Sequence, residues 1–247
     1  MEPVIFKKEG KIGRITLNRP AKYNSFDFEM VDAFEKILEG LRYDEETTVI
    51  VIDGGEAKGF CAGLDTETYA PAIFEMSPVK AYDAQARMSR LFLKMRQIPQ
   101  PVIACIHGAA AGIGFSIAMA SDVRIITEDA KFSAAYINIG LGGADMSSSY
   151  FLPRLIGSGR ANEYLLTGNW MKSEEAVNLG FVSQVTDKGS LVEKGMEIAS
   201  VMTQKNPMGI RMTKEAINSN LDCAGLEAAL NMEDRNQMMI AYTYKIK

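Results

Sequence analysis

Apolar positions in the first 130 residues follow two alternating patterns. Strand character is found at residues 12–18, 49–52, 102–106 and 123–126, mostly as short runs rich in β-branched side chains. Residues 27–41 and 81–96 instead carry apolar side chains at the spacing of an amphipathic helix. Strands that alternate with helices predict an α/β fold with a mostly parallel sheet and right-handed crossovers.

From residue 147 onward the apolar pattern becomes helical. Helices are predicted over residues 150–156, 159–166, 173–179, 191–203, 207–218 and 226–239. One predicted strand, 181–185, lies among them. The chain shows no internal repeat. We place a boundary near Gly189, between a sheet-based core at 1–189 and a C-terminal helical lobe at 190–247.

Composition and charge exclude several classes of protein. The 247 residues are 47% apolar, enough for a well-filled core, and the formal net charge is −4. That charge provides no basic field for nucleic acid, and no apolar run approaches the ~20 residues of a membrane helix. The three cysteines are odd in number and lack metal-type spacing, so we expect a reduced, cytoplasmic protein without a bound metal.

Candidate chemistry must rest on carboxylates, hydroxyls or the backbone, because the chain has a single histidine, His107. Two loops of small residues follow predicted strands, at 60–65 (Phe-Cys-Ala-Gly-Leu-Asp) and 107–114 (His-Gly-Ala-Ala-Ala-Gly-Ile-Gly). Small residues let backbone N–H groups approach a ligand, and the second loop opens a helix whose N-terminus favours negative charge. Two such N–H groups on one oxygen would form an oxyanion hole.

Tight packing of helix against strand is the alternative explanation of both loops. The stretch 112–114 also resembles a dinucleotide-binding fingerprint. Its glycines lack the full spacing, and no suitable acidic residue ends the next strand. We therefore expect no nucleotide cofactor.

The two loops belong to a longer series of motifs. The others are Asn-Arg-Pro at 18–20, Ser-Asp at 121–122, Ala-Lys-Phe at 130–132, Leu-Pro-Arg-Leu-Ile-Gly at 152–157, Leu-Thr-Gly at 166–168 and the segment 174–182. In this order, over nearly the whole chain, they resemble the crotonase (enoyl-CoA hydratase/isomerase) superfamily. The resemblance implies a crotonase-like ββα spiral with a C-terminal helical lobe, assembled as a homotrimer or a dimer of trimers. It also implies an acyl-CoA thioester substrate and no separate cofactor.

The resemblance assigns site residues as well. The N–H groups of Leu64 and Ile113 fall where family members hold the thioester oxygen as negative charge develops. The positions that fall on the CoA moiety or shape the pocket are Lys22, Tyr23, Ser25, Cys61, Ala62, Gly63, Asp65, Gly112, Ser116 and Tyr136.

Two departures from the family pattern bear on the reaction. Typical hydratases carry two glutamates that hold a water molecule, and those positions are here Ser116 and Tyr136. Neither is a carboxylate base near neutral pH, because a tyrosine with a pKa of about 10 serves only as an acid or hydrogen-bond donor. Hydration by two glutamates is therefore not expected.

Asp145, in the loop 142–150, is the carboxylate that remains. An aspartate in this loop occurs in the isomerase and 4-chlorobenzoyl-CoA dehalogenase branches, although the histidine and tryptophan of the dehalogenases are replaced by Ser89 and Tyr136. Burial beside a thioester would raise the pKa of this carboxyl toward the range of a general base. Capping of the following helix is the alternative role.

We therefore expect an acyl-CoA-processing enzyme in which Asp145 moves protons and the Leu64 and Ile113 N–H groups stabilise a thioester enolate. Isomerisation is favoured over two-glutamate hydration. Thioester hydrolysis or dehalogenation on the same scaffold is one alternative, and a catalytically silent acyl-CoA-binding protein is another. The identity of the product distinguishes these hypotheses.

Overall fold

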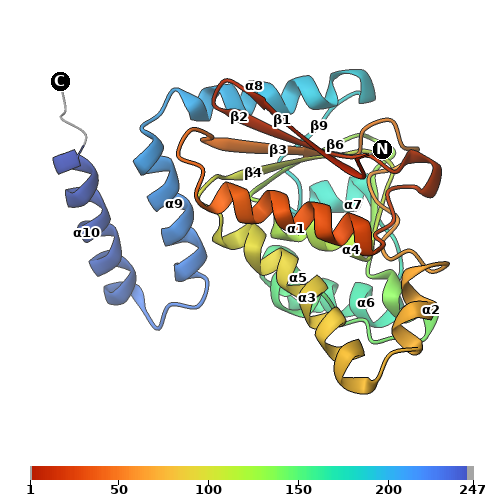
Figure 1. The fold of residues 1–247 in the computed structure, drawn as a ribbon. Coiled ribbons are helices and arrows are strands. Elements are labelled where there is room, and N and C mark those ends of the chain that lie inside the picture. The colour runs from red at the N-terminus through yellow and green to blue at the C-terminus, as the bar shows by residue number, and fades with distance from the viewer. Residues whose placement is uncertain (1, 244–247) are drawn as a thin grey trace.

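A six-stranded sheet with the order β1-β2-β3-β4-β6-β9 lies at the centre of the computed structural model, which describes residues 2–243 (Figure 1). Its strands are Val4–Glu9 (β1), Ile12–Leu17 (β2), Val49–Asp53 (β3), Val102–Ile106 (β4), Val123–Ile126 (β6) and Gln184–Val185 (β9). β1 pairs antiparallel with β2, and every other neighbouring pair is parallel. The predicted α/β class with a mostly parallel sheet is confirmed.

The central strands are buried on both faces. In β3, Ile50 and Ile52 join the larger core cluster, whereas Val49 and Val51 join a second cluster on the opposite face. Because successive strand side chains point to opposite faces, a strand covered on both sides must be apolar at every position. This accounts for the unbroken apolar run at 49–52 in the sequence.

Helices cover both faces of this sheet. α1 (Phe28–Arg42), α3 (Pro78–Gln97) and α4 (Ile113–Ala120) pack on the face of the larger cluster, and α8 (Leu191–Thr203) lies on the other face (Figure 1). The approach of α8 is close at Gly195, where an added Cβ would lie 2.4 Å from the sulfur of Cys105 on β4.

The C-terminal helices divide into two groups. α8, which the sequence places in a helical lobe, packs on the sheet, whereas α9 (Pro207–Asn220) and α10 (Leu226–Thr243) extend away from it (Figure 1). Lys214 anchors α9, because its buried ammonium donates to the carbonyls of Met95 and Gln100 at 3.1 and 2.8 Å. The helices that extend away from the sheet therefore begin after α8. The boundary near Gly189 stays a prediction.

A second, three-stranded sheet and several short helices complete the described chain. They are β5 (Ala109–Ala111), β7 (Lys131–Ser133), β8 (Met171–Lys172), α2 (Tyr69–Phe74), α5 (Ser148–Ile156), α6 (Ser158–Thr167), α7 (Ser173–Asn178) and the 3₁₀ turns η1 (Pro20–Lys22), η2 (Ala135–Ile139) and η3 (Lys188–Ser190). None of the helices in residues 2–243 is long and apolar enough to cross a bilayer.

The sequence pattern differs from the structure at several elements. It does not predict β1, which forms because Gly10, with φ of +61°, turns the chain back along β2. Of the strand expected at 181–185, β9 forms at the last two residues. Phe181, the first residue of the expected strand, instead packs its ring against Phe115 and Phe132, at centroid distances of 5.7 and 5.0 Å.

Candidate active site

The two small-residue loops lie side by side beyond the carboxyl ends of β3 and β4. The Cys61 N–H donates to the Ala109 carbonyl (3.1 Å), and the Ala111 N–H donates back to the Cys61 carbonyl (2.9 Å). This pairing requires small residues, since a Cβ on Gly114 would lie 2.5 Å from the Cys61 carbonyl oxygen. The structure therefore joins the two loops into one backbone unit.

Leu64 and Ile113 follow two glycines that are in contact. A Cβ on either Gly63 or Gly112 would lie 3.6 Å from the Cα of the other, and both have positive φ, +101° and +49°. Within the described residues, neither the Leu64 nor the Ile113 N–H donates a backbone hydrogen bond. Ile113 also begins α4, at the helix end that favours negative charge. These features are what an oxyanion hole requires, and that role stays a prediction.

The two positions that hold glutamates in typical hydratases also meet. Ser116 lies on α4 and Tyr136 on η2, and their buried side-chain oxygens are 3.1 Å apart. The Tyr136 hydroxyl also donates to the Gly112 carbonyl at 3.3 Å. Burial raises the pKa of Tyr136 above its usual value, so the phenol stays protonated. The pair contains no carboxylate base, and its expected role in shaping the pocket stays a prediction.

Asp145 is half-buried in the loop before α5. Its Oδ1 accepts hydrogen bonds from the Met146 N–H (2.7 Å) and from Nε2 of Gln85 on α3 (2.8 Å). Its Oδ2 accepts none within residues 2–243, and its own N–H donates to Oγ of Ser148 (3.1 Å). Ser147 occupies the N-cap position of α5, which has no side-chain cap. The alternative in which Asp145 caps this helix is therefore wrong.

The surroundings of Asp145 favour its neutral form. Burial raises the pKa of this carboxyl, while the hydrogen bonds from Met146 and Gln85 lower it in part. The Asp145 charge in turn contributes to the raised pKa of Tyr136. A carboxylate with a raised pKa and one free oxygen can take up and return a proton.

Residues 22–25 line the edge of the first loop. The Ala62 N–H donates to the Tyr23 carbonyl (3.0 Å), and the Cys61 thiol donates to the Asn24 carbonyl (3.1 Å). Lys22 is exposed and paired with Glu67. The predicted residues Lys22, Tyr23, Ser25 and Cys61 to Asp65 are thus brought together, and their contact with CoA stays a prediction.

Two of these predicted side chains point into the protein. Asp65, 3% exposed, accepts a hydrogen bond from the Thr68 N–H (3.1 Å) and pairs with Arg19 (3.1 Å). Burial alone would raise the pKa of Asp65, but Arg19 and the Thr68 N–H hold it below its usual value. Burial raises the pKa of Cys61 to about 12. Substrate contacts at these two positions would therefore come from the backbone.

Gln85 was missed at the level of sequence. It lies one helical turn before Ser89 on α3, and the Ser89 hydroxyl donates to its carbonyl at 3.1 Å. The spacing from Ser89, a position already compared with the family's site, is the signal that would find it.

Within residues 2–243, no group of three or more His, Cys, Asp or Glu side chains is arranged to hold a metal ion.

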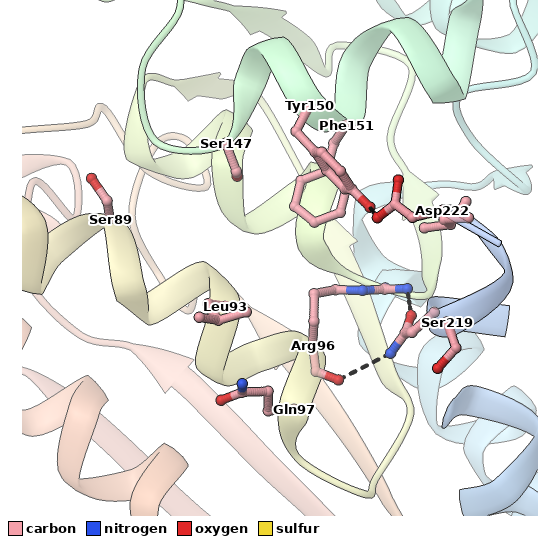
Figure 2. A pocket seen from close by; sticks show the side chains of 11 residues that line it. Ser89, Leu93, Arg96, Gln97, Ser147, Tyr150, Phe151, Ser219 and Asp222 are labelled. Atoms are coloured by element: carbon pink, nitrogen blue, oxygen red, sulfur yellow. Dashed lines mark hydrogen bonds between the residues drawn. The ribbon is translucent and has the colours of Figure 1, made fainter. Parts of the chain in front are cut away.

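A cavity of about 510 Å³ lies between α3, α5 and the connection from α9 to α10. It is lined by Ser89, Leu93, Arg96, Gln97, Ser147, Tyr150, Phe151, Asn218, Ser219, Leu221 and Asp222. Figure 2 shows Ser89 and Ser147 toward one end and Ser219 and Asp222 toward the other. Ser89 lies one helical turn after Gln85, and Ser147 lies two residues after Asp145, so the end of the cavity at Ser89 and Ser147 is called its near end.

A polar cluster formed by Tyr150, Arg154 and Asp222 lies at the far end of the cavity. Arg154 pairs with Asp222 at 3.0 Å and lies over the Tyr150 ring, 3.9 Å from its centroid. The Tyr150 hydroxyl also donates to Asp222 (Figure 2). These polar groups are therefore already paired with one another.

Proteins of known structure or sequence are similar to this chain. The crystal structure of an enoyl-CoA hydratase from Bacillus anthracis matches with a TM-score of 0.91 at 30% identity, over 98% of this chain and 92% of that one. A probable enoyl-CoA hydratase, echA12, of Mycobacterium leprae is 36% identical over 234 residues, which is 94% of this chain and 79% of the relative. A 1,2-epoxyphenylacetyl-CoA isomerase of Escherichia coli K12 is 30% identical over 233 residues, 94% and 88% of the two chains.

Fold and loop geometry thus define a crotonase-type protein. A sequence model of the family described as enoyl-CoA hydratase/isomerase matches residues 7–247. The chain belongs to this family of acyl-CoA-processing enzymes, which confirms the resemblance carried by its motifs. Its relatives include hydratases and an isomerase, so their names do not choose between the two reactions.

Proposed function

We propose that this chain shifts a carbon–carbon double bond of an acyl-CoA thioester, using Asp145 as its single acid/base. The observation that carries the proposal is that Asp145 is the one carboxylate among the described site residues that is not paired with a basic side chain. Among the described site residues the carboxylates are Asp65 and Asp145, and Asp65 is committed to Arg19. Ser116 and Tyr136 occupy the two positions where hydration of the typical kind would need glutamates.

The proposed reaction moves one proton between two carbons. Asp145 removes a proton from C2 of a 3-enoyl thioester, and the resulting dienolate carries its charge to the thioester oxygen. The Leu64 and Ile113 N–H groups donate to that oxygen, and one such donor typically contributes about 3–4 kcal/mol to the transition state. Protonated Asp145 then returns the proton to C4, which yields the 2-enoyl thioester and restores the carboxylate.

The cavity between α3 and α5 supports the same placement of the substrate. With C2 to C4 beside Asp145, the rest of the acyl group continues past Ser89 and Ser147 into this space. Its volume of about 510 Å³ is several times the roughly 150 Å³ that accommodates benzene in a protein interior. We therefore propose a medium-length or ring-bearing acyl group.

Assembly as a homotrimer or a dimer of trimers is part of the proposal. Within the described residues, α10 has no buried side chain and leaves large apolar residues such as Leu226 and Leu230 exposed. A helix of this kind gains stability from burial against another surface. Light scattering of the purified protein tests this part independently of turnover.

The test of the reaction is mass spectrometry of an acyl-CoA panel incubated with the protein in heavy water. The panel holds 2-enoyl, 3-enoyl, cyclic enoyl and halogenated aryl thioesters, and chromatography identifies double-bond isomers. We expect 3-enoyl and 2-enoyl thioesters to interconvert without addition of water, and to gain deuterium to the extent that the protonated Asp145 carboxyl exchanges with solvent before it returns the proton. Addition of heavy water would indicate hydration instead. Release of free CoA or halide would indicate a hydrolytic branch, and binding without any product would indicate a silent scaffold.

A further inference from the structure

The Asp145 carboxylate accepts one hydrogen bond from a different element of the fold, α3. The Met146 N–H belongs to the same loop as Asp145, and Ser148, whose hydroxyl accepts from the Asp145 N–H, begins the helix that follows directly. Gln85 comes from α3, 60 residues earlier in the chain. Its Nε2 lies 2.8 Å from Oδ1, within the range of a strong charge-assisted hydrogen bond.

The helix that carries Gln85 is well anchored. Met88 and Leu91, three and six residues further on, are fully buried in the main core. On another face of α3, Arg87 and Lys94 both pair with Glu35 of α1. A donor on such a helix is a fixed reference point for a loop that contains two left-handed, non-glycine residues, Met146 and Ser147.

The two carboxylate oxygens of Asp145 are therefore not equivalent. Oδ1 accepts both hydrogen bonds, from Met146 and Gln85, whereas Oδ2 accepts none within the described chain. A proton arriving on Oδ2 leaves Oδ1 as a carbonyl-type acceptor. The Gln85 amide can then donate to Oδ1 in both protonation states, so its geometry need not change during proton transfer.

We propose that Gln85 is a positioning residue that binds Oδ1 of Asp145 and thereby presents Oδ2 to the substrate. This inference rests on the proposed function, because it assumes that Asp145 carries the proton. Gln85 is expected to set the orientation of the base without touching the CoA moiety, since residues 22–25 and 61–65 come from other parts of the fold.

Other charged groups near this pair are accounted for. On η2, Tyr136 is coupled to Asp145 and remains protonated because it is buried. On α3, Arg87 is occupied by Asp32 and Glu35 of α1. On α5, Arg154 is paired with Asp222. A change in Asp145 titration on replacement of Gln85 can therefore be assigned to the lost amide donor.

The experiment compares wild-type protein with Gln85→Leu, which keeps the size of the side chain and removes the donor. Gln204→Leu, at the exposed end of α8, is the matched control. The titration of Asp145 is followed by NMR of ¹³C-carboxyl-labelled aspartate, with its signal assigned by its loss in Asp145→Asn. Steady-state rates against pH are measured on the isomerised thioester, together with thermal unfolding.

We expect Gln85→Leu to raise the pKa of Asp145, since an amide donor stabilises the charged carboxylate. The rising limb of kcat/KM should shift to the same higher pH, and kcat should fall about ten- to hundredfold with little change in KM. Gln85→Glu should raise the Asp145 pKa further by charge repulsion. Gln204→Leu should leave titration and rates unchanged.

The results separate this inference from the proposed function. An unmoved Asp145 pKa in Gln85→Leu, or a moved pKa with wild-type kcat, overturns the positioning role while leaving the isomerase proposal intact. A lower melting temperature in Gln85→Leu that accompanies the loss of rate, with no shift in the pH dependence of kcat/KM, would also overturn it, because this would show a purely structural role. A wild-type protein that turns over no thioester overturns the proposed function, and the catalytic part of the inference with it.

Discussion

The two halves of the candidate site are built in different ways. The Leu64 and Ile113 N–H groups belong to loops that pair with each other directly beyond buried strands of the main sheet. The Asp145 carboxylate is instead held by side-chain and backbone donors on a short loop, with its outside tie supplied by Gln85. The first half is specified by the backbone and the second by individual side chains. The first should therefore tolerate side-chain changes that the second does not.

Left-handed backbone marks both halves. In the described part of the chain, the non-glycine residues with positive φ are Tyr23, Asn24, Met146 and Ser147. Such conformations typically cost about 1–3 kcal/mol each and persist where other contacts enforce them. The Asn24 amide provides such contacts by donating to two buried carbonyls at 2.8 and 2.9 Å. Strain is thus concentrated around the two predicted parts of the site.

Replacing Asp145 is expected to have the largest effect, because it removes the acid/base half and leaves the other half intact. Asp145→Asn should lower turnover by about 10²- to 10⁴-fold, the usual contribution of a general base. CoA affinity should stay unchanged in calorimetric titration, because the loop at 61–65 is untouched. Near-normal turnover in this variant would contradict the assignment.

The backbone half should fail through its glycines. In Gly63→Ala, the new Cβ lies 3.1 Å from the Ala111 carbonyl oxygen at φ of +101°, so the peptide leading to Leu64 must move. Loss of one oxyanion donor predicts a roughly 10²- to 10³-fold lower kcat. Gly40→Ala, with open space around it on α1, is the control. Comparable activity in the two variants would argue against the oxyanion hole.

Filling the near end of the acyl cavity should change selectivity while preserving both halves. Ser89→Phe narrows the passage beside Gln85, so kcat/KM for long or ring-bearing acyl groups should fall about ten- to hundredfold relative to short ones. Ser89→Ala should leave the ratio near that of the wild type. A chain-length series measured on the three proteins checks this, and an unchanged ratio in Ser89→Phe would remove the cavity from the substrate path.

Acidification should act on the Asp145 half alone. Burial raises the pKa of this carboxyl, so kcat/KM should fall tenfold per pH unit below a value higher than the ~3.9 of an ordinary aspartate. The same shift favours the folded state below the unfolded pKa, and this stability is lost as pH rises through the folded pKa. Asp145→Asn should therefore melt no lower than wild type at neutral pH, which calorimetry across pH checks.

The smallest expected effect lies at the edge of the backbone half, on the exposed Lys22–Glu67 pair. If Lys22 contacts a CoA phosphate, Glu67→Gln frees it, and the Kd for CoA should fall about two- to fivefold at low salt. The gain should shrink as salt screens the charges. Lys22→Ala should weaken binding instead, and equal affinity in all three proteins would place CoA elsewhere.

Sequence order and glycine spacing predict the fold and the backbone half well. The predicted helix at 191–203 coincides with α8, and the predicted loops at 60–65 and 107–114 do meet. Glycine is favoured where the backbone has positive φ or approaches another segment closely, so glycines in a sequence indicate such places without coordinates. The functional roles placed on these loops remain predictions, whereas the family is established.

The carboxylate half is only partly visible in the sequence. Asp145 can be singled out because two glutamates are missing, but its partner Gln85 is an unremarkable polar residue on a helix. The contact depends on how α3 lies against the loop before α5, and that packing has no local signal. The same reason explains why the cavity wall contributed by Leu221 and Asp222 could not be predicted.

The cavity takes one wall from the short connection between α9 and α10, whereas the residues proposed to transfer the proton and to stabilise the enolate lie between positions 60 and 150. If the proposed roles hold, part of the wall that sets substrate size is encoded apart from the residues of the reaction, although the rest of the wall comes from α3 and α5. Insertions or substitutions near residues 219–225 are then expected to alter which acyl groups are accepted without changing the proposed proton transfer. In laboratory evolution, this connection is the place to diversify when a new substrate is sought.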